Sequence, residues 1–555
     1  PHNEITGFIT LFSDEVILQC SFISLVKLYL RILAFRKKIL FLITFATLAR
    51  LIIASAIELG NDEVYYWTYA LHLQSNYFDH PPIVGWLIRL TTANLLLHTE
   101  LFVRLGAIIS SAICTLLIYK IGTVISSRQT GWYAALLYTA SIYSSIIAGT
   151  FILPDSPQMV FWLWSILLLV KIVNLPVNNP QSRILWCWFG ISAGLCIMSK
   201  VHGVFLWFAV GLYAVFFNRI WLKDKSVYLS AVISLLIVSP IIVWNIQHHF
   251  ISYTYHGNRV SLTGAGLNID GFVREFFGGF FYNNPLNFLL IWSSIIAFWK
   301  GRLPTNKREI RLLLCCSLPL IAVLLFVSMF KDTLPHWSGP AYSSLIILAA
   351  IRLASVPDNK ISRVRTFLKS SLSFIVMLAI AGILIINFFP GTLSPKKSGD
   401  KMGDGDFTLD LYGWKKAGAA IDFIYKQDVI KKIMPVNSPI IVNKWFPAAH
   451  IDFYIASVTG QQTYSLGSLF DLHHYHWLNK YKKPLKNGDA AYFIMPSNLY
   501  KPEDIEHLKQ SFESISSPIV ISIYRSGMLC KKFFIFRLKS YQSVALGIDN
   551  LNINQ

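Results

Sequence analysis

Charged residues are scarce in this sequence. They make up only 14% of the 555 residues, while 54% are hydrophobic and the mean hydropathy is +0.51. Soluble domains carry roughly a quarter charged residues. The chain therefore lacks the polar surface that a water-soluble protein needs, and the sequence predicts a membrane protein.

Cysteine is scarce too, with seven residues in the whole chain. Cys530 is the only cysteine after residue 390, which excludes an internal disulfide in the C-terminal region. No internal repeat is found either, and repeats are typical of secondary transporters.

Long apolar runs are plentiful instead. We expect about eleven crossings, because each run approaches the roughly 17–25 residues that span a hydrocarbon core. The clear runs are 39–57, 105–121, 132–148, 159–170, 228–244, 312–330, 341–351 and 372–389, and shorter or interrupted ones are 184–199, 204–217 and 276–299. The fold class predicted is a polytopic α-helical membrane protein.

The net charge of +20 suggests a nucleic-acid partner at first sight. Most Lys and Arg of the first 390 residues, however, fall in short loops, where they set membrane topology. The basic residues 36–38 place that end of the first run in the cytoplasm, and alternation keeps most later cations there. The segment 83–97 would reverse this pattern if it crossed, so we expect a helix lying at the outer interface.

Carboxylates and cations then collect on the outer side. Asp62 and Asp155 stand at two helix ends there, and sugar transfer needs a carboxylate to take a proton from the acceptor hydroxyl. In a single displacement that base faces away from the leaving group, which gives inversion. Asp62 suits the base role, and Asp155 could orient it or share a cation. A simpler interpretation of Asp155 is a helix N-cap.

A phosphate leaving group needs positive charge where negative charge develops. Lys200 closes an apolar helix at the outer boundary, and His256 and Arg259, three residues apart, share one face of any helix there. The simpler interpretation of Lys200 is a side chain snorkelling from a helix end. His249 is a candidate ligand or a solvated loop residue. Aromatic residues such as Tyr66 form an interfacial belt or stack on a sugar.

Two motifs carry a family resemblance. Residues 61–67 read Asn-Asp-Glu-Val-Tyr-Tyr-Trp, and residues 77–82 read Tyr-Phe-Asp-His-Pro-Pro. With Pro154-Asp155, Ser199-Lys200 and the histidines up to residue 256, they resemble the family 39/83-type glycosyltransferases. These have the GT-C fold and include protein O-mannosyltransferases and the lipid A aminoarabinose transferase.

The resemblance implies an inverting transferase that takes a sugar from a polyprenyl-phosphate donor to a lipid, glycan or protein. It implies Asp62 as base and Asp155 as a second acidic residue. It assigns the donor phosphate to Lys200, His256 and Arg259. By the resemblance, the acceptor side would be lined by Glu63, Asp79 and His80. From the residues themselves, Tyr66 and His249 are further candidates for binding the acceptor or the sugar. A bacterial inner membrane, with the site on the periplasmic side, is the expected location.

The composition changes after residue 389. We expect a transmembrane domain over 36–390 and a small extracytoplasmic α/β domain over 391–555, with strands at 440–442, 491–494, 519–523 and 533–536 and helices at 412–431, 448–457 and 502–512. Residues 1–35 form an extension whose native status is open.

His473, His474 and His476 lack a carboxylate or cysteine at a metal-site spacing, so no metal site is predicted there. No cofactor is expected to be required, and a divalent cation stays an open alternative. Two other function classes stay open: a secondary transporter and a non-catalytic envelope assembly protein.

Overall fold

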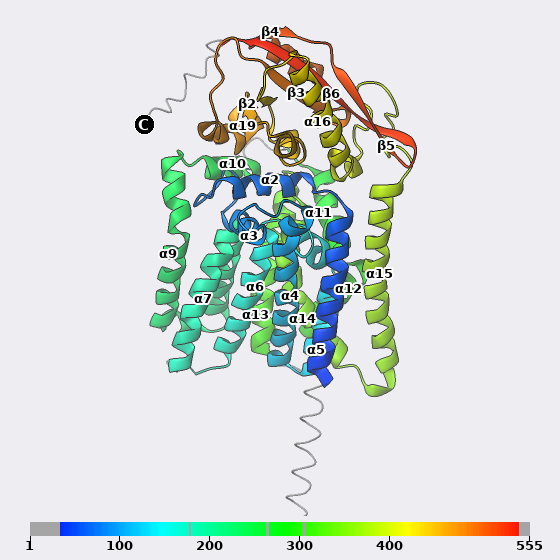
Figure 1. Cartoon of the computed structure of the whole chain (residues 1–555). Coiled ribbons are helices and arrows are strands. Elements are labelled where there is room, and N and C mark those ends of the chain that lie inside the picture. Colours follow the sequence, from blue (N-terminus) through cyan, green and yellow to red (C-terminus); the bar gives the residue numbers. More distant parts are fainter. Residues whose placement is uncertain (1–33, 177–178, 262–265, 304–306, 543–555) are drawn as a thin grey trace, which may run out of the picture.

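The computed structural model describes residues 34–176, 179–261, 266–303 and 307–542. A bundle of helices carries a mixed α/β unit on one end, and we call that end the outer end (Figure 1). Among the described residues, seven helices are long and apolar enough to cross a membrane. They are Ala34–Ala56, α4 (Glu100–Ile125), α6 (Asp155–Val173), α7 (Pro180–Ser199), α9 (Lys225–Gln247), α13 (Lys307–Ser328) and the helix Asp358–Phe388, which contains α15 (Ile361–Phe388).

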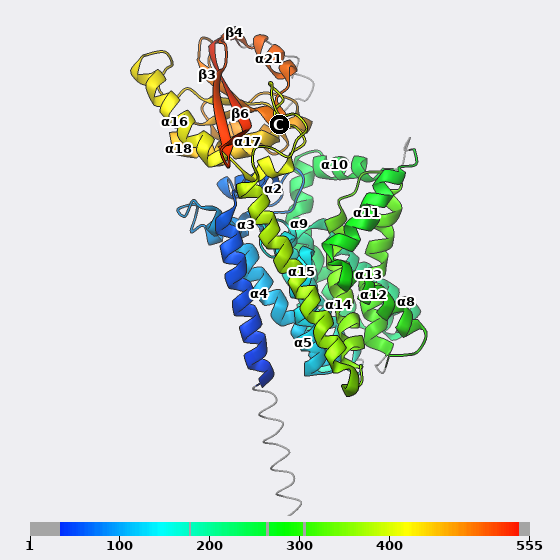
Figure 2. The same ribbon diagram turned by 90° about the vertical axis from the view of Figure 1, so that its right-hand side faces the viewer.

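Four shorter helices complete the bundle: α5 (Arg128–Ala140), α8 (Phe205–Phe216), α12 (Pro285–Trp299) and α14 (Gly339–Ala354). All four contribute to one buried apolar cluster with the long helices. The helices α2 (Asn61–Leu71), α3 (Ile83–Thr91), α10 (Ile251–Val260) and α11 (Ile269–Tyr282) lie toward the outer end (Figures 1 and 2). The helix expected over 83–97 is present as α3 but ends at Thr91, because the backbone of 93–95 adopts positive φ in a turn.

Two expected crossings are interrupted. The run 132–148 ends as α5 at Ala140, and a π-helix, η1 (Tyr143–Ile147), follows. The run 276–299 divides into α11 and α12 at Asn284, which has a φ of 66° and whose side chain accepts a hydrogen bond from the Leu286 backbone. Asn284 also donates to the carbonyl of Ala140, at 3.0 Å, so packing fixes this break. Hydropathy cannot locate such breaks, because the flanking residues are equally apolar.

A six-stranded sheet follows the last long helix. Its strands are β1 (Ile440–Val442), β2 (Thr463–Ser465), β3 (Ala491–Pro496), β4 (Phe512–Ile515), β5 (Ile519–Arg525) and β6 (Met528–Tyr541), and its helices include α16 (Trp414–Ile430), α17 (Trp445–Ile451), α19 (Leu469–Leu472), α20 (Tyr475–Leu478) and α21 (Pro502–Lys509). The strand order is β2-β1-β3-β6-β4, with β5 also on β6. The strands β1, β2 and β3 are parallel, and β6 is antiparallel to β3, β4 and β5.

The sheet unit contains the four strands expected from the sequence and two more, β2 and β4. The helix expected over 502–512 ends at Lys509, because Phe512 pairs with Tyr541 in the sheet. The helix expected over 448–457 is α17, which continues as a π-helix over Asp452–Ala456.

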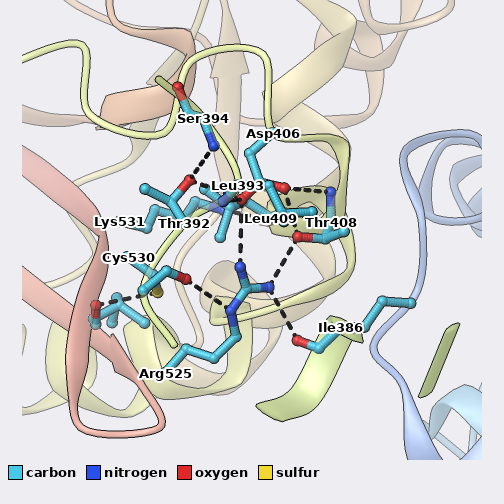
Figure 3. A network of polar contacts seen from close by, with 12 residues as sticks. Ile386, Thr392, Leu393, Ser394, Asp406, Thr408, Leu409, Arg525, Cys530 and Lys531 are labelled. Carbon is cyan, nitrogen blue, oxygen red and sulfur yellow. Dashed lines mark hydrogen bonds and ion pairs between the residues drawn. The ribbon is translucent and has the colours of Figure 1, made fainter. Parts of the chain in front are cut away.

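Contacts of two kinds hold the sheet unit on the bundle. One buried apolar cluster runs from α2 and α3 into α16, α17 and the sheet. The second contact is a polar network around Arg525, which is fully buried (Figure 3). Its guanidinium donates to the carbonyl of Ile386 in α15 at 3.1 Å and to Thr408 at 2.9 Å, and it pairs with Asp406 at 3.3 Å. The sheet unit is therefore fixed to the end of α15 as well as to α2.

Candidate active site

Asp62 stands in the first turn of α2. Acidic residues are favoured there, since the helix dipole is positive at that end. The side chain of Asp62 is exposed. Within the described ranges, no hydrogen bond or ion pair engages its carboxylate, which leaves it available to a ligand.

The next residue, Glu63, fixes the start of α2. Its carboxylate accepts two hydrogen bonds from Arg104 of α4, at 2.8 and 2.6 Å, and one from the Gly60 backbone at 2.9 Å. It also accepts the backbone N–H of Ile152, at 3.1 Å, just before α6. One buried carboxylate thus ties the segment that carries Asp62 to the segment that carries Asp155.

Asp155 is the first residue of α6 and is buried. One of its oxygens accepts from Lys200 Nζ at 2.7 Å, and the other accepts from the Tyr143 hydroxyl at 2.9 Å. Lys200 follows the last residue of α7 and is only 3% exposed. A buried cation and a buried carboxylate of this kind are stable only when paired.

Asp62 lies within electrostatic range of this pair. Removal from bulk water raises the pKa of Asp62 to about 6, and the negative charges of Asp79 and Glu63 act in the same direction, while Lys200 opposes them. The carboxylate is open to solvent but surrounded by protein. Such a group is poised to exchange a proton near neutral pH.

The motif at residues 77–82 forms the next part of the site. Asp79 accepts hydrogen bonds from the hydroxyls of Tyr65, at 3.1 Å, and Tyr69. Burial opposes ionisation of Asp79, but its hydrogen bonds, above all that with His473, bring the pKa of Asp79 below its usual range. Burial lowers the pKa of His80 to about 3, so His80 is neutral.

Two predicted phosphate ligands approach from α10. His256 Nε2 lies 2.7 Å from the backbone oxygen of Asp79. The guanidinium of Arg259 lies over the rings of Tyr255, at 5.6 Å, and Trp337, at 5.2 Å. His256 therefore borders the group formed by Asp79 and His80, and Arg259 lies three residues farther along α10, against aromatic rings.

Of the remaining predicted residues, Tyr66 lies at this group and His249 does not. Tyr66 is buried, with its ring edge-on to His80 at 5.5 Å. His249 is exposed, in the turn between α9 and α10, and no contact brings it to this group among the residues described. The structure thus brings together Asp62, Asp79, His80, Asp155, Lys200, His256 and Arg259 at the outer end, and leaves His249 apart.

Three sequence interpretations need correction. Asp155 is not an N-cap, because Pro154 holds that position and both carboxylate oxygens bond to side chains. Lys200 does not snorkel toward water, because it is buried against Asp155. Glu63 does not line a ligand site, because it is 2% exposed and saturated by Arg104 and two backbone N–H groups.

Sequence reasoning missed two residues of this group. Tyr143 gave no signal in the sequence. Its hydroxyl reaches Asp155 only because Tyr143 lies in the π-helix η1, which the sequence did not predict. His473 comes from the sheet unit, and its Nδ1 lies 3.7 Å from Asp79. Its ring stacks between Phe78, at 4.8 Å, and Trp445, at 5.5 Å. The sequence did single out the histidines around 473, but only as metal candidates.

No set of three or more His, Cys, Asp or Glu side chains that could hold a metal occurs in the part of the chain that the structure describes.

Comparison with known proteins places this geometry in context. Residues 79–244 match the family model described as dolichyl-phosphate-mannose-protein mannosyltransferase. The lipid A galacturonosyltransferase RgtD of Rhizobium johnstonii is 22% identical over 291 residues, which are 52% of this chain and 59% of that protein. The undecaprenyl phosphate-alpha-4-amino-4-deoxy-L-arabinose arabinosyl transferase 2 of Proteus mirabilis is 26% identical over 339 residues, 58% of each chain. This chain thus matches somewhat under two thirds of the length of these relatives.

The similarity in fold to solved structures covers more of the chain than the similarity in sequence does. The crystal structure of ArnT from Cupriavidus metallidurans in the apo state superposes with a TM-score of 0.58 at 12% identity, covering 89% of this chain and 97% of that one. The same protein bound to undecaprenyl phosphate gives 0.57 at 13% identity, with the same coverage. The resemblance predicted from the motifs is confirmed: in sequence and in fold, the chain is similar to the GT-C glycosyltransferases of the protein mannosyltransferase and ArnT type.

Proposed function

We propose that this protein is an inverting glycosyltransferase that moves a sugar from a polyprenyl-phosphate donor to a hydroxyl group of a lipid, glycan or protein acceptor. The observation that carries the proposal is the exposed Asp62 carboxylate beside the buried pair of Asp155 and Lys200. The relatives support it, since they are named as transferases and one related structure is titled as bound to undecaprenyl phosphate.

The proposed reaction is a single displacement at the anomeric carbon. The acceptor oxygen attacks that carbon while Asp62 takes the hydroxyl proton. The bond from the anomeric carbon to the phosphate oxygen breaks, and the phosphate leaves with the electron pair. Because attack and departure occur on opposite faces of the sugar, the configuration inverts.

The other residues of the site have separate roles in this scheme. Lys200, with Arg259 and His256, stabilises the negative charge that grows on the leaving phosphate. Asp155 and Tyr143 keep the Lys200 ammonium in place until the donor arrives. Asp79, His80 and Tyr66 orient the sugar or the acceptor from the other side of Asp62. No cofactor takes part in this scheme, and a divalent cation would have to be tested directly.

The proposal includes a location. We infer eleven crossings, from the seven long apolar helices and from α5, α8, α12 and α14, in a transmembrane domain over 36–390. The outer end, with the site and the domain over 391–555, would face the periplasm across a bacterial inner membrane. The basic loops at the opposite end support this orientation, since cations are retained on the cytoplasmic side.

The test is Asp62→Asn, with Asp332→Asn as the matched control. Asp332 lies in the outer loop after α13 and is 75% exposed, in an ion pair with Arg274. Loss of a general base lowers the rate by about 10²–10⁴-fold. We expect Asp62→Asn to abolish sugar transfer in cells, as measured by mass spectrometry of envelope glycans. Binding of undecaprenyl phosphate to the purified Asp62→Asn protein should stay intact. Unchanged transfer by Asp62→Asn would rule out this mechanism.

A further inference from the structure

A groove runs along the membrane-facing side of the bundle, and Ser145 and Ile146 of η1, the π-helix that also carries Tyr143, line one end of it. It lies between the helix Ala34–Ala56, α5 and α15, and has a volume of about 630 Å³. Its walls are apolar and include Phe41, Phe45, Leu136, Ile375 and Val376. Phe41 is 73% and Phe45 60% exposed, so no side chain among the described residues 34–176, 179–261, 266–303 and 307–542 fills the groove.

The helices that form the groove meet at the outer end and separate toward the other end, which we call the inner end (Figure 2). At the outer end the Asn387 side chain of α15 donates to the carbonyl of Ala56, at 3.2 Å. Farther along, the groove reaches Lys37 at the start of the first helix. From Arg50 to Lys37 the helix rises about 20 Å. One leaflet of a bilayer has a hydrocarbon depth of about 15 Å, half of the roughly 30 Å core.

The mouth of the groove is positively charged. A second hollow, of about 420 Å³, adjoins it and shares Lys38 and Trp132 with it. Arg365 and Lys369 of α15 line this second hollow, four residues apart and so on one helix face. Neither hollow is lined by Asp or Glu, and none of these three cations forms an ion pair within the described part of the chain.

Arg50 lies near the deep end of the groove. It is 3% exposed and donates to the Ser145 hydroxyl at 3.0 Å and to the Ser145 carbonyl at 3.4 Å. Arg50 is therefore held by the π-helix η1, and beyond Arg50 the groove reaches one more turn of the first helix, to Ile53.

We propose that this groove binds a phospholipid with an anionic headgroup. The phosphate would lie at the mouth against Lys38, Arg365 and Lys369, and the acyl chains would occupy the apolar groove toward Arg50. Charge complementarity supports this occupant over a neutral lipid, because cations from two helices distant in the sequence converge on one hollow without a counter-charge. Arg binds phosphate through two parallel hydrogen bonds, which adds geometric preference to charge.

The bound lipid would brace the first helix against α15. The outer end of the first helix leads directly into α2 and Asp62, and α15 leads into the sheet unit. A lipid wedge between the inner halves of these helices would stabilise the arrangement from which both outer parts project. This proposal does not depend on the proposed transferase activity.

The test is native mass spectrometry of the full-length protein titrated with phosphatidylglycerol or phosphatidylcholine. We expect one phosphatidylglycerol to bind at least about tenfold more tightly than phosphatidylcholine. The variant Lys38→Gln/Arg365→Gln/Lys369→Gln should weaken that binding by on the order of 100-fold, given the affinity that each basic residue near a membrane surface contributes. The control Lys300→Gln/Lys307→Gln/Arg308→Gln removes three cations, one just after the end of α12 and two at the start of α13, and should bind as the wild type does.

A second variant tests the groove without changing charge. Ala379→Phe inserts a ring among the lining residues and should also abolish the preferred binding. Equal binding of both lipids, unchanged binding in the triple variant, or cross-links that place another part of this chain or a second copy in the groove would overturn the proposal.

Discussion

The two ends of the helix bundle differ in whether their charged side chains are paired. At the outer end, Glu63, Arg104, Asp155 and Lys200 are all buried and paired. At the inner end, Lys38, Arg365 and Lys369 line an open hollow without a carboxylate. Paired buried charges hold backbone segments in fixed positions, which chemistry requires, whereas unpaired cations at a membrane surface remain available to lipid phosphates.

Breaking the pair of Glu63 and Arg104 is expected to have the largest effect on stability. Arg104→Met leaves a buried carboxylate without its cation, which costs about 3–5 kcal/mol of unfolding free energy. Arg274→Met, which removes the cation of the exposed pair with Asp332, should cost under about 1 kcal/mol. Thermal unfolding of both variants in detergent measures the difference.

The double variant Glu63→Gln/Arg104→Met sharpens this prediction. A neutral Gln removes the unpaired buried charge, and its single amide oxygen can still accept from the backbone N–H of either Gly60 or Ile152, so it should recover part of the lost stability. Equal losses in Arg104→Met and Arg274→Met would mean that the buried pair does not fix α2.

The pH dependence of transfer tests the electrostatics of the outer end. With the pKa of Asp62 at about 6, the carboxyl is protonated below that pH and cannot accept a proton. The rate should therefore fall about tenfold for each pH unit below 6 and level off above it. Asp79→Asn removes a negative charge that raises this pKa, so the midpoint in single-turnover assays should move to lower pH. An unchanged midpoint would contradict the assignment of Asp62 as base.

The smallest expected effect concerns His473, which the sheet unit contributes. His473→Ala removes a ring that stacks on Phe78 and approaches Asp79, and a contact of this size is worth about 0.5–1.5 kcal/mol. We expect kcat/KM to fall by up to about tenfold. His476→Ala is the control, since His476 lies on the same segment and contacts Trp477 instead. Equal effects of both substitutions would indicate general destabilisation of the sheet unit.

Much of the arrangement was predictable because it depends on the hydropathy of short stretches of consecutive residues. Hydropathy located the apolar segments, and short apolar runs located β1, β3, β5 and the centre of β6. The strand β4 was missed because its burial depends on a partner, Tyr541, that is 29 positions away from Phe512. The sequence placed 276–299 among the shorter or interrupted runs but did not locate the break at Asn284, because the hydrogen bonds of Asn284 reach Ala140 and Ser371 in other helices.

By itself, the sequence determined that this protein is a membrane-embedded helix bundle with acidic and basic residues gathered at one end. It did so through composition and spacing, which act along the chain. Only the tertiary structure decided that Glu63 is an anchor while Asp62 stays free, that Lys200 pairs with Asp155, and that His473 reaches Asp79. The physical reason is that a buried charge takes whichever partner the packing of distant helices brings within hydrogen-bond distance.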